Sequence, residues 1–148
     1  TWDADGKVTS SHPTADLNPV EVAARLTAMQ GVVKQTVPPY SAVKVNGTPL
    51  YRLARRGETV APVEKTVQIY SWRDVSVALP EVAFTVECGG GTYVRSLAWM
   101  LGRELGCGAH LKSLRRLNVG AFSVTDAFPG ENLKTMTRDE IAARLLTL

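Results

Sequence analysis

The sequence predicts an α+β fold in which helices flank a mixed, largely antiparallel sheet that carries a protruding lobe. Residues 82–87 alternate apolar and polar side chains, which is typical of a strand that buries one face. Residues 63–79, which contain Val67, Ile69, Tyr70, Val75 and Val77, are consistent with one long strand or two shorter ones. Helical patterns stand before and after these strands. Because no strand–helix–strand unit repeats along the chain, an antiparallel sheet is favoured over a parallel one.

The chain opens with a turn and a helix. Asp5-Gly6 is a strong turn signal, and we expect one strand to end before it and another to begin after it. Asn18, Pro19 and Glu21 supply a helix cap, a first-turn proline and a glutamate three residues after the cap. A helix is therefore predicted to begin here.

A short strand and a distinct segment follow this helix. Residues 32–37 favour a strand, which two consecutive prolines terminate. In the segment 38–62, residues 40–45 again favour a strand, Asn46-Gly47 is a hairpin turn, and a short helix is expected over residues 48–57.

The segment 38–62 combines positive charges with aromatic rings. Cationic side chains bind phosphates and aromatic rings stack on bases, so the segment has the composition of an RNA clamp. The alternative is an ordinary solvated helix face, and the residue types alone do not choose between the two. The side chains concerned are Tyr40, Lys44, Tyr51, Arg52, Arg55 and Arg56.

The middle of the chain predicts a strand, a glycine turn, a helix and a basic strand, in that order. The strand of residues 82–87 ends before three glycines at 89–91, and Thr92 can cap the helix that follows. Apolar side chains recur at helical spacing until Gly106 ends the helix. Residues 110–117 then interleave apolar with cationic side chains, which predicts the basic strand.

Tyr93 and Arg95 stand at the start of this helix, where chemistry is expected. Backbone N–H groups in the first turn of a helix favour anions, and an arginine adds a planar donor fork for a carboxylate or phosphate. A glycine-rich turn before a helix is also common as a purely structural feature. This one lacks the Gly-Lys-Ser/Thr sequence of a phosphate-binding loop.

Two elements are predicted towards the end of the sequence. Residues 119–124 favour a short strand. Thr137 and Glu140 form a capping box, from which a last helix should continue through Leu146.

Composition sets broad limits on function. With 148 residues, of which 45% are hydrophobic, the chain can bury one core. It contains no apolar run long enough to span a membrane and no signal-peptide pattern at its start. The 17 basic and 14 acidic residues give a net charge of +3, which is too small to identify a nucleic-acid-binding protein by itself.

The cysteines and histidines do not predict a metal site. Cys88, Cys107, His12 and His110 lack the spacing of metal ligands. Two buried thiols in a cytoplasmic protein are favoured over a disulfide or a zinc site. No feature demands a partner subunit, so a monomer is expected.

Three segments carry a resemblance to a known family. They read DADG, PPYSAVKVNGTPLYRLARRG and GTYVRSLAWMLGRELGCGAHLKSLRRL. With them the chain resembles the TruB-type tRNA pseudouridine synthase B family, whose members isomerise the T-loop uridine at position 55 of tRNA to pseudouridine. The resemblance implies the pseudouridine synthase fold, the T-arm stem-loop of tRNA as partner, and no metal or other cofactor.

The resemblance also implies roles for individual residues. Asp3 is expected to form an ion pair with Arg95, which would orient the family's catalytic aspartate. Tyr93 is expected beside the flipped uridine and Leu114 in its apolar pocket. The segment 38–62 matches the thumb that closes over the stem-loop. The residues expected to bind RNA are Tyr40, Lys44, Tyr51, Arg52, Arg55, Arg56, His110, Lys112, Arg115 and Arg116.

One family motif is missing from these residues. The essential aspartate of the family belongs to a Gly-x-Leu-Asp-Pro-x-Ala-Thr-Gly motif on the N-terminal side of everything matched here, and no such motif occurs in the sequence. Residues 1–148 are therefore expected to be a partial catalytic domain that lacks its N-terminal part. By itself the chain is expected to be inactive.

Two other functions stay open at this point. The missing aspartate favours a non-catalytic RNA-binding or RNA-folding module that uses the thumb and the basic strand without chemistry. A guide-RNA-dependent pseudouridine synthase would share the GTYVR-like core, but an enzyme whose guide RNA selects the substrate has no need of the thumb.

Overall fold

The computed structural model describes residues 1–143 and divides into two compact units, Thr1–Ser113 and Leu114–Leu148. The composition predicted one core, and the core lies in the first unit. Every buried apolar side chain among the described residues belongs to it: Val22, Leu26, Met29, Val37, Leu50, Val67, Ile69, Leu97, Ala98 and Leu101. No helix in the described part of the chain is long and apolar enough to cross a membrane.

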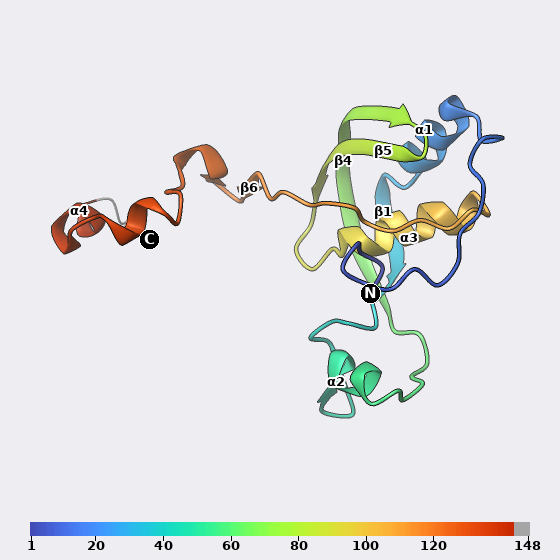
Figure 1. Cartoon of the computed structure of the whole chain (residues 1–148), viewed down its shortest axis with the longest axis horizontal. Coiled ribbons are helices and arrows are strands. Elements are labelled where there is room, and N and C mark those ends of the chain that lie inside the picture. The colour runs from blue at the N-terminus through green and yellow to red at the C-terminus, as the bar shows by residue number, and fades with distance from the viewer. Residues whose placement is uncertain (144–148) are drawn as a thin grey trace. The chain divides into compact units, whose positions relative to one another are not determined.

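The first unit is built on a three-stranded sheet with the strand order β1-β4-β5 (Figure 1). The strands are β1 (Gly31–Thr36), β4 (Glu64–Ala78) and β5 (Glu81–Cys88). Both pairings are antiparallel. The predicted antiparallel meander is therefore confirmed, with residues 64–78 forming one long strand. Two register shifts interrupt the pairing of β4 with β5.

Two helices cover one face of this sheet. They are α1 (Pro19–Ala28) and α3 (Val94–Glu104). Leu26 of α1 and Leu101 of α3 meet in one buried cluster, against which apolar side chains of the sheet pack. Leu97 of α3 joins Val67 and Ile69 of β4 in a second cluster. Burial of these side chains is the main force that holds the helices on the sheet.

The start of α1 is as predicted. The side chain of Asn18 accepts a hydrogen bond from the backbone N–H of Val20 at 2.9 Å, and Pro19 occupies the first turn. A side-chain oxygen at this position satisfies one of the N–H groups that the first turn leaves unpaired.

The start of α3 differs from the prediction that Thr92 caps it. Tyr93 is the capping residue and makes no side-chain capping bond. The hydroxyl of Thr92 instead donates to the carbonyl oxygen of Gly89 at 2.8 Å, which closes the glycine turn. The Thr92 side chain therefore stabilises the glycine turn, one residue before the cap of the helix.

The lobe between β1 and β4 stands apart from the sheet in Figure 1. It contains a small hairpin of β2 (Lys44–Val45) and β3 (Thr48–Pro49), followed by α2 (Leu50–Arg55). The hairpin turn at Asn46-Gly47 is confirmed, and both residues have positive φ angles of 50° and 80°. Such angles are those of the two-residue turn that matches the twist of a hairpin.

Two boundaries in this lobe were predicted wrongly. Of residues 40–45, only the last two form a strand. The helix begins at Leu50 and not at Thr48, because Thr48 and Pro49 pair with the strand before the turn. The lobe is too small to hold a longer ladder, so most of the predicted strand is irregular.

The strands predicted on either side of the Asp5-Gly6 turn and over residues 110–117 do not form. The Asp5-Gly6 turn is present, but it is not flanked by strands, since only Asp3 takes part in a single parallel bridge with Leu111. The prediction of a basic strand over residues 110–117 is wrong for the same reason. A strand needs a partner along its length, and among the described residues only Leu111 has one.

The second unit is formed by short elements. They are the hairpin of β6 (Asn118–Val119) and β7 (Phe122–Ser123), two 3-10 turns at Val124–Asp126 and Asn132–Lys134, and α4 (Arg138–Ala142). The single strand predicted over residues 119–124 is wrong, because the chain reverses at Gly120 with a φ of 55°. The capping box at the start of α4 is confirmed. Its predicted end at Leu146 lies outside the described residues.

The cysteines are less buried than predicted. Cys88 at the end of β5 and Cys107 after α3 are both free thiols, and both are half-buried. Cys88 packs against the cluster of Val67, Ile69 and Leu97.

Gly102 of α3 lies in close contact with the backbone that follows this helix in the first unit. A Cβ atom at Gly102 would overlap the backbone of Gly108 and Ala109, whereas one at Gly90 would meet nothing within 4 Å. We expect Gly102→Ala to lower the free energy of unfolding by about 1–3 kcal/mol, although alanine is the better helix former. Gly90→Ala should change it by less than about 0.5 kcal/mol. Urea denaturation of both variants measures the difference, and equal stabilities would contradict this close packing.

Candidate functional site

One side chain connects three separate parts of the first unit. Arg95 stands in the first turn of α3, and its Nη1 donates to the carbonyl oxygen of Thr1 and to Oδ2 of Asp3, both at 3.0 Å. Its Nη2 donates to the carbonyl oxygen of Tyr40, also at 3.0 Å. A single guanidinium therefore joins the N-terminal turn, the base of the α2 lobe and α3.

The predicted ion pair between Asp3 and Arg95 is present. Both side chains are 23% exposed, so water screens the pair only in part. Hydrogen bonding with the Thr1 side chain and the nearby charge and hydrogen bond of Arg95 lower the pKa of Asp3 from its ordinary value of 3.8, although partial burial opposes this. The carboxyl group is therefore ionised at neutral pH and holds Arg95 from one side.

The glycine turn before α3 is fixed by a buried amide. Gln35 of β1 has no exposed surface, and its Oε1 accepts from the backbone N–H of Tyr93 at 3.1 Å. Its Nε2 donates to the carbonyl oxygen of Gly91 at 3.5 Å. One turn into the helix, the hydroxyl of Ser96 donates to the carbonyl oxygen of Thr36 at 2.6 Å. The end of β1 thus holds the start of α3, and with it Tyr93 and Arg95.

Sequence analysis missed Gln35, although a signal was available. In the strand 31–36 the inward positions alternate, and Gln35 falls on the buried face between Val33 and Val37. A long polar side chain at an inward position must be hydrogen-bonded there. Such a position marks a structural or functional requirement.

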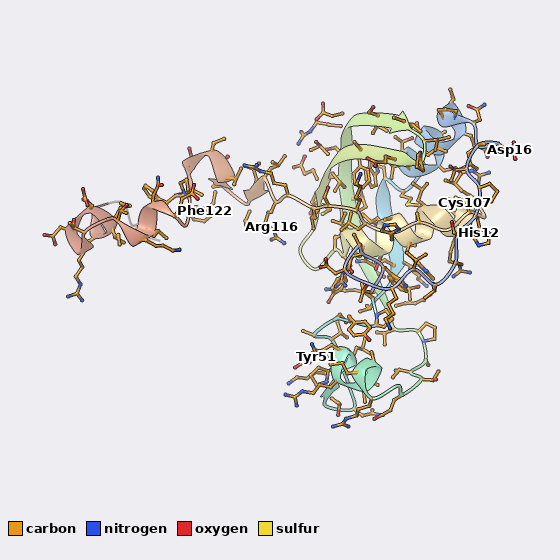
Figure 2. The ribbon with its side chains drawn as sticks, viewed as in Figure 1. His12, Asp16, Tyr51, Cys107, Arg116 and Phe122 are labelled. Carbon is orange, nitrogen blue, oxygen red and sulfur yellow. The ribbon has the colours of Figure 1, made fainter. Side chains whose placement is uncertain are left out.

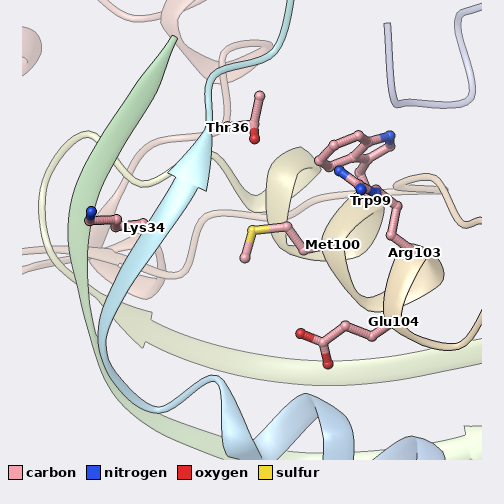
Figure 3. A pocket seen from close by; sticks show the side chains of 6 residues that line it. All are labelled: Lys34, Thr36, Trp99, Met100, Arg103 and Glu104. Atoms are coloured by element: carbon pink, nitrogen blue, oxygen red, sulfur yellow. The ribbon is translucent and has the colours of Figure 1, made fainter. Parts of the chain in front are cut away.

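A second contact between the N-terminal turn and α3 is aromatic. The indole rings of Trp2 and Trp99 stack with centroids 4.3 Å apart and an angle of 12° between their planes. The guanidinium carbon of Arg103 lies 4.8 Å from the centroid of the Trp99 ring. Figure 3 shows Arg103 against this indole on α3. Sequence analysis did not identify this group, because its members are far apart in the chain.

Trp99 also borders two hollows of the first unit. The more apolar hollow, of about 330 Å³, lies between the α2 lobe and the stacked indoles and is lined by residues that include Val37, Leu50 and Val63. The other, of about 290 Å³, is shown in Figure 3 and has a mixed lining: Lys34, Thr36, Trp99, Met100, Arg103 and Glu104. The lobe is therefore not packed tightly onto the core along its whole length.

The α2 lobe carries the predicted cluster of cations and aromatic rings. The guanidinium carbons of Arg52 and Arg55 lie 5.9 and 5.5 Å from the centroid of the Tyr51 ring. Arg56 forms an exposed ion pair with Glu58 at 3.6 Å. Figure 2 shows the Tyr51 side chain on this lobe. All three arginines are exposed, as are Tyr40 and Lys44.

The other residues that are expected to bind RNA or the uridine lie after α3. His110 and Lys112 are exposed, and Lys112 forms an ion pair with Glu81. The predicted site residues of the second unit are also exposed, with Leu114 at 63%. They are Leu114, Arg115 and Arg116, the last of which Figure 2 labels. Their expected roles stay predictions.

Two family models match the chain. The model of the TruB family pseudouridylate synthase N-terminal domain matches residues 1–94, and that of the tRNA pseudouridylate synthase B C-terminal domain matches residues 95–147. The border between the two matches falls at the start of α3. Arg95 and its three acceptors therefore come from both matched regions.

Curated relatives with the name tRNA pseudouridine synthase B are similar over nearly the whole chain. The protein of Opitutus terrae is 40% identical over 97% of this chain, that of Nitrosococcus oceani 41% over 97%, and that of Burkholderia mallei 46% over 98%. The chain spans 60%, 46% and 48% of the length of these relatives.

A solved structure shares the fold. A chain in the crystal structure of a Cbf5-Nop10-Gar1 complex matches 76% of this chain with a TM-score of 0.57 and 28% identity. The match covers 29% of that longer chain.

The ion pair at this site can be tested through its dependence on pH. Because the pKa of Asp3 is lower in the folded state than in the unfolded state, the pair stabilises the fold fully above about pH 4 and loses its effect as the pH falls through the folded-state pKa. At about pH 7, Asp3→Asn should lower the free energy of unfolding by about 1 kcal/mol. The difference from wild type should shrink below about pH 4.

Urea denaturation at a series of pH values measures this difference. Asp5→Asn is the matched control, since Asp5 is exposed in the same turn, and it should show little effect at any pH. A difference for Asp3→Asn that stays constant down to about pH 2.5 would contradict the role of its ionised carboxylate.

Proposed function

This chain belongs to the TruB family of pseudouridylate synthases, and we propose that it forms part of a tRNA pseudouridine synthase that isomerises the T-loop uridine of tRNA. In the proposed reaction the glycosidic bond of the uridine breaks, the base turns, and a bond forms between carbon atoms of base and sugar. Residues 1–148 would supply the thumb and the arginine side of the active site. The nucleophilic or otherwise essential aspartate would come from the part of the protein outside this chain.

The observation that carries the proposal is the convergence at Arg95. The three segments through which the sequence resembles the family are the DADG turn, the thumb and the GTYVR motif. Arg95 belongs to the GTYVR motif and is bonded to the other two. A guanidinium has five N–H donors, and these contacts use three of them. Among the described residues, the donors left over are the Nε–H and one N–H of Nη2. They can bind a carboxylate, which is the role proposed for Arg95 towards the missing aspartate.

The proposal gives the other residues of the site supporting roles. Extrusion of a uridine from its loop costs a few kcal/mol, which apolar walls and phosphate contacts must recover. Tyr93, held by Gln35, would lie beside the flipped base, and Leu114 would form part of its apolar wall. His110 and Lys112, together with Arg115 and Arg116, would contact the RNA backbone.

The α2 lobe would act as the thumb over the T-arm stem-loop. Support comes from the three exposed arginines that accompany Tyr51, because cations bind phosphates and a tyrosine ring can stack on a base. The apolar hollow of about 330 Å³ beneath the lobe leaves room for the lobe to adjust when RNA binds. We further propose that the protein acts as a monomer in the cytoplasm, where it would meet its tRNA.

The names of the curated relatives support this proposal. The relatives named tRNA pseudouridine synthase B are 40–46% identical to the chain over nearly its whole length. A module that binds RNA without chemistry remains the second candidate, and an activity assay distinguishes the two.

The first experiment compares two proteins on an unmodified T-arm stem-loop. The full-length protein that contains this chain should form pseudouridine, and the isolated chain, with an intact mass of 16.0 kDa, should bind the RNA without turnover. In the full-length protein, Arg95→Lys should lower kcat about a hundredfold, because an ammonium cannot bridge the same acceptors and the carboxylate would be misplaced.

Arg73→Lys is the matched control for this variant. Arg73 lies on β4 and is exposed, where it pairs with Glu87 at 3.8 Å. Its substitution should leave kcat within about twofold of wild type. Turnover by the isolated chain would contradict the need for the missing aspartate, and a full-length protein that binds RNA without turnover would favour the non-catalytic module.

The role of the thumb is tested by the salt dependence of RNA binding. If Arg52, Arg55 and Arg56 each neutralise a phosphate, alanine at each position should weaken binding and reduce the slope of log K against log salt by about one unit or less. Arg25→Ala is the control, since Arg25 lies on α1 and pairs with Glu21. Unchanged slopes for the three thumb variants would indicate that these arginines form an ordinary solvated helix face and do not bind phosphates.

A further inference from the structure

The segment before α1 is irregular, although it carries Asp3. Residues 7–13 and 15–16 are exposed, and no helix or strand forms before α1. An irregular, exposed segment loses much conformational entropy when it is fixed. The position of Asp3 must therefore be set by its immediate neighbours.

Those neighbours include the stacked indoles of Trp2 and Trp99. Trp99 follows Arg95 by four residues, so the two side chains lie on the same face of α3, one turn apart. Trp2 directly precedes Asp3 in the chain. Two consecutive residues of the N-terminal turn thus meet two consecutive turns of α3: Trp2 lies on Trp99, and Asp3 is bonded to Arg95.

The backbone of Trp2 shows that this arrangement is imposed by tertiary contacts. Its φ angle is 62°, in the left-handed region that a bulky side chain rarely adopts. A conformation of this kind persists only where surrounding contacts outweigh its cost. Besides the stack, the contact that holds Trp2 is the hydrogen bond from the backbone N–H of Leu111 to its carbonyl oxygen at 3.0 Å.

We infer that Trp2 and Trp99 are positioning residues, whose stacked indoles hold Asp3 against Arg95 and thereby orient the guanidinium. The inference rests on the proposed function where it concerns catalysis, but its structural part does not. Arg103 supports the stack through its guanidinium, which lies over the Trp99 ring. None of these three side chains is needed to touch the RNA.

The same stack also holds a second segment. Ala4 donates to the carbonyl oxygen of Leu111 at 3.0 Å, and Leu111 donates to that of Trp2 at the same distance. Leu111 stands between His110 and Lys112, which are proposed to bind RNA. If the indoles separate, both hydrogen bonds should open more often and the segment should lose its fixed place beside the N-terminal turn.

The structural test measures amide hydrogen exchange at Ala4 and Leu111 in the chain itself. Trp99→Leu should reduce the protection of both amides about tenfold, because it removes the stack and leaves the rest of α3 intact. Trp99→Phe should keep most of the protection, since a smaller aromatic ring can still stack. The internal reference is the amide of Gly89, which donates to the carbonyl oxygen of Gln68 at 2.8 Å. Its exchange should not change in these variants.

Trp72→Phe is the matched control for loss of an indole. Trp72 packs edge-on against Phe84 in the core, with ring centroids 5.1 Å apart, and has no part in the stack. After correction for any change in global stability, Trp72→Phe should leave the amide protection of Ala4 and Leu111 the same as in wild type. Equal protection of these two amides in wild type and Trp99→Leu would overturn the inference.

The catalytic test uses the full-length protein and the T-arm stem-loop. Trp99→Leu should lower kcat about tenfold and leave KM within about twofold, and Trp99→Phe should restore most of kcat. A rise in KM with unchanged kcat would show that the indole binds RNA and would overturn the positioning role. Absence of turnover in wild type would refute the proposed function instead, and the exchange experiment would still decide whether the stack holds Asp3.

Discussion

The structure depends on the guanidinium of Arg95, which joins the N-terminal turn and the base of the α2 lobe to α3. Its three acceptors are supplied by the residue that opens the chain, by the turn that contains Asp3, and by the base of the α2 lobe. Arginine suits this task because its donors have a fixed planar arrangement and stay charged at any physiological pH. The ionised carboxylate of Asp3 in turn prevents the charge from being left unpaired at a partly buried position. The geometry of the proposed active site is therefore a property of this one side chain and its acceptors.

The start of α3 is held more firmly than the α2 lobe. The start of α3 is fixed by Gln35 and Ser96, both fully buried and both bonded across the gap between strand and helix. Buried polar groups that are fully satisfied specify one arrangement, since any other would leave them without partners. The α2 lobe, by contrast, is joined to the core through the chain segments at its two ends and through the contact of Tyr40 with Arg95, and a hollow of about 330 Å³ lies beside it. In the proposed function, the firm start of α3 would fix the positions of the catalytic groups, and the lobe would adjust its position when RNA binds.

The distribution of charge matters more than its sum. A net charge of +3 does not identify a nucleic-acid-binding protein, but the arginines of α2 concentrate positive charge on a lobe that protrudes. The same lobe places the Tyr51 ring among these arginines, so that charge and stacking surface act together. In the proposed function these cations would bind phosphates of the stem-loop, and the Tyr51 ring would stack on a base.

The sequence by itself determined the elements whose signals are local. Apolar patterns predicted β4 and β5, Asn18 and Thr137 marked the starts of α1 and α4, and the family motifs predicted the pair of Asp3 with Arg95. Only the tertiary structure decided which segments find partners. Residues 110–117 look like a strand but form a β-bridge only at Leu111 among the described residues, and Trp2 meets an indole 97 positions away, because such contacts join residues that no local pattern relates. Periodicity reports which side of an element is buried, whereas the choice of neighbour depends on the packing of the whole unit.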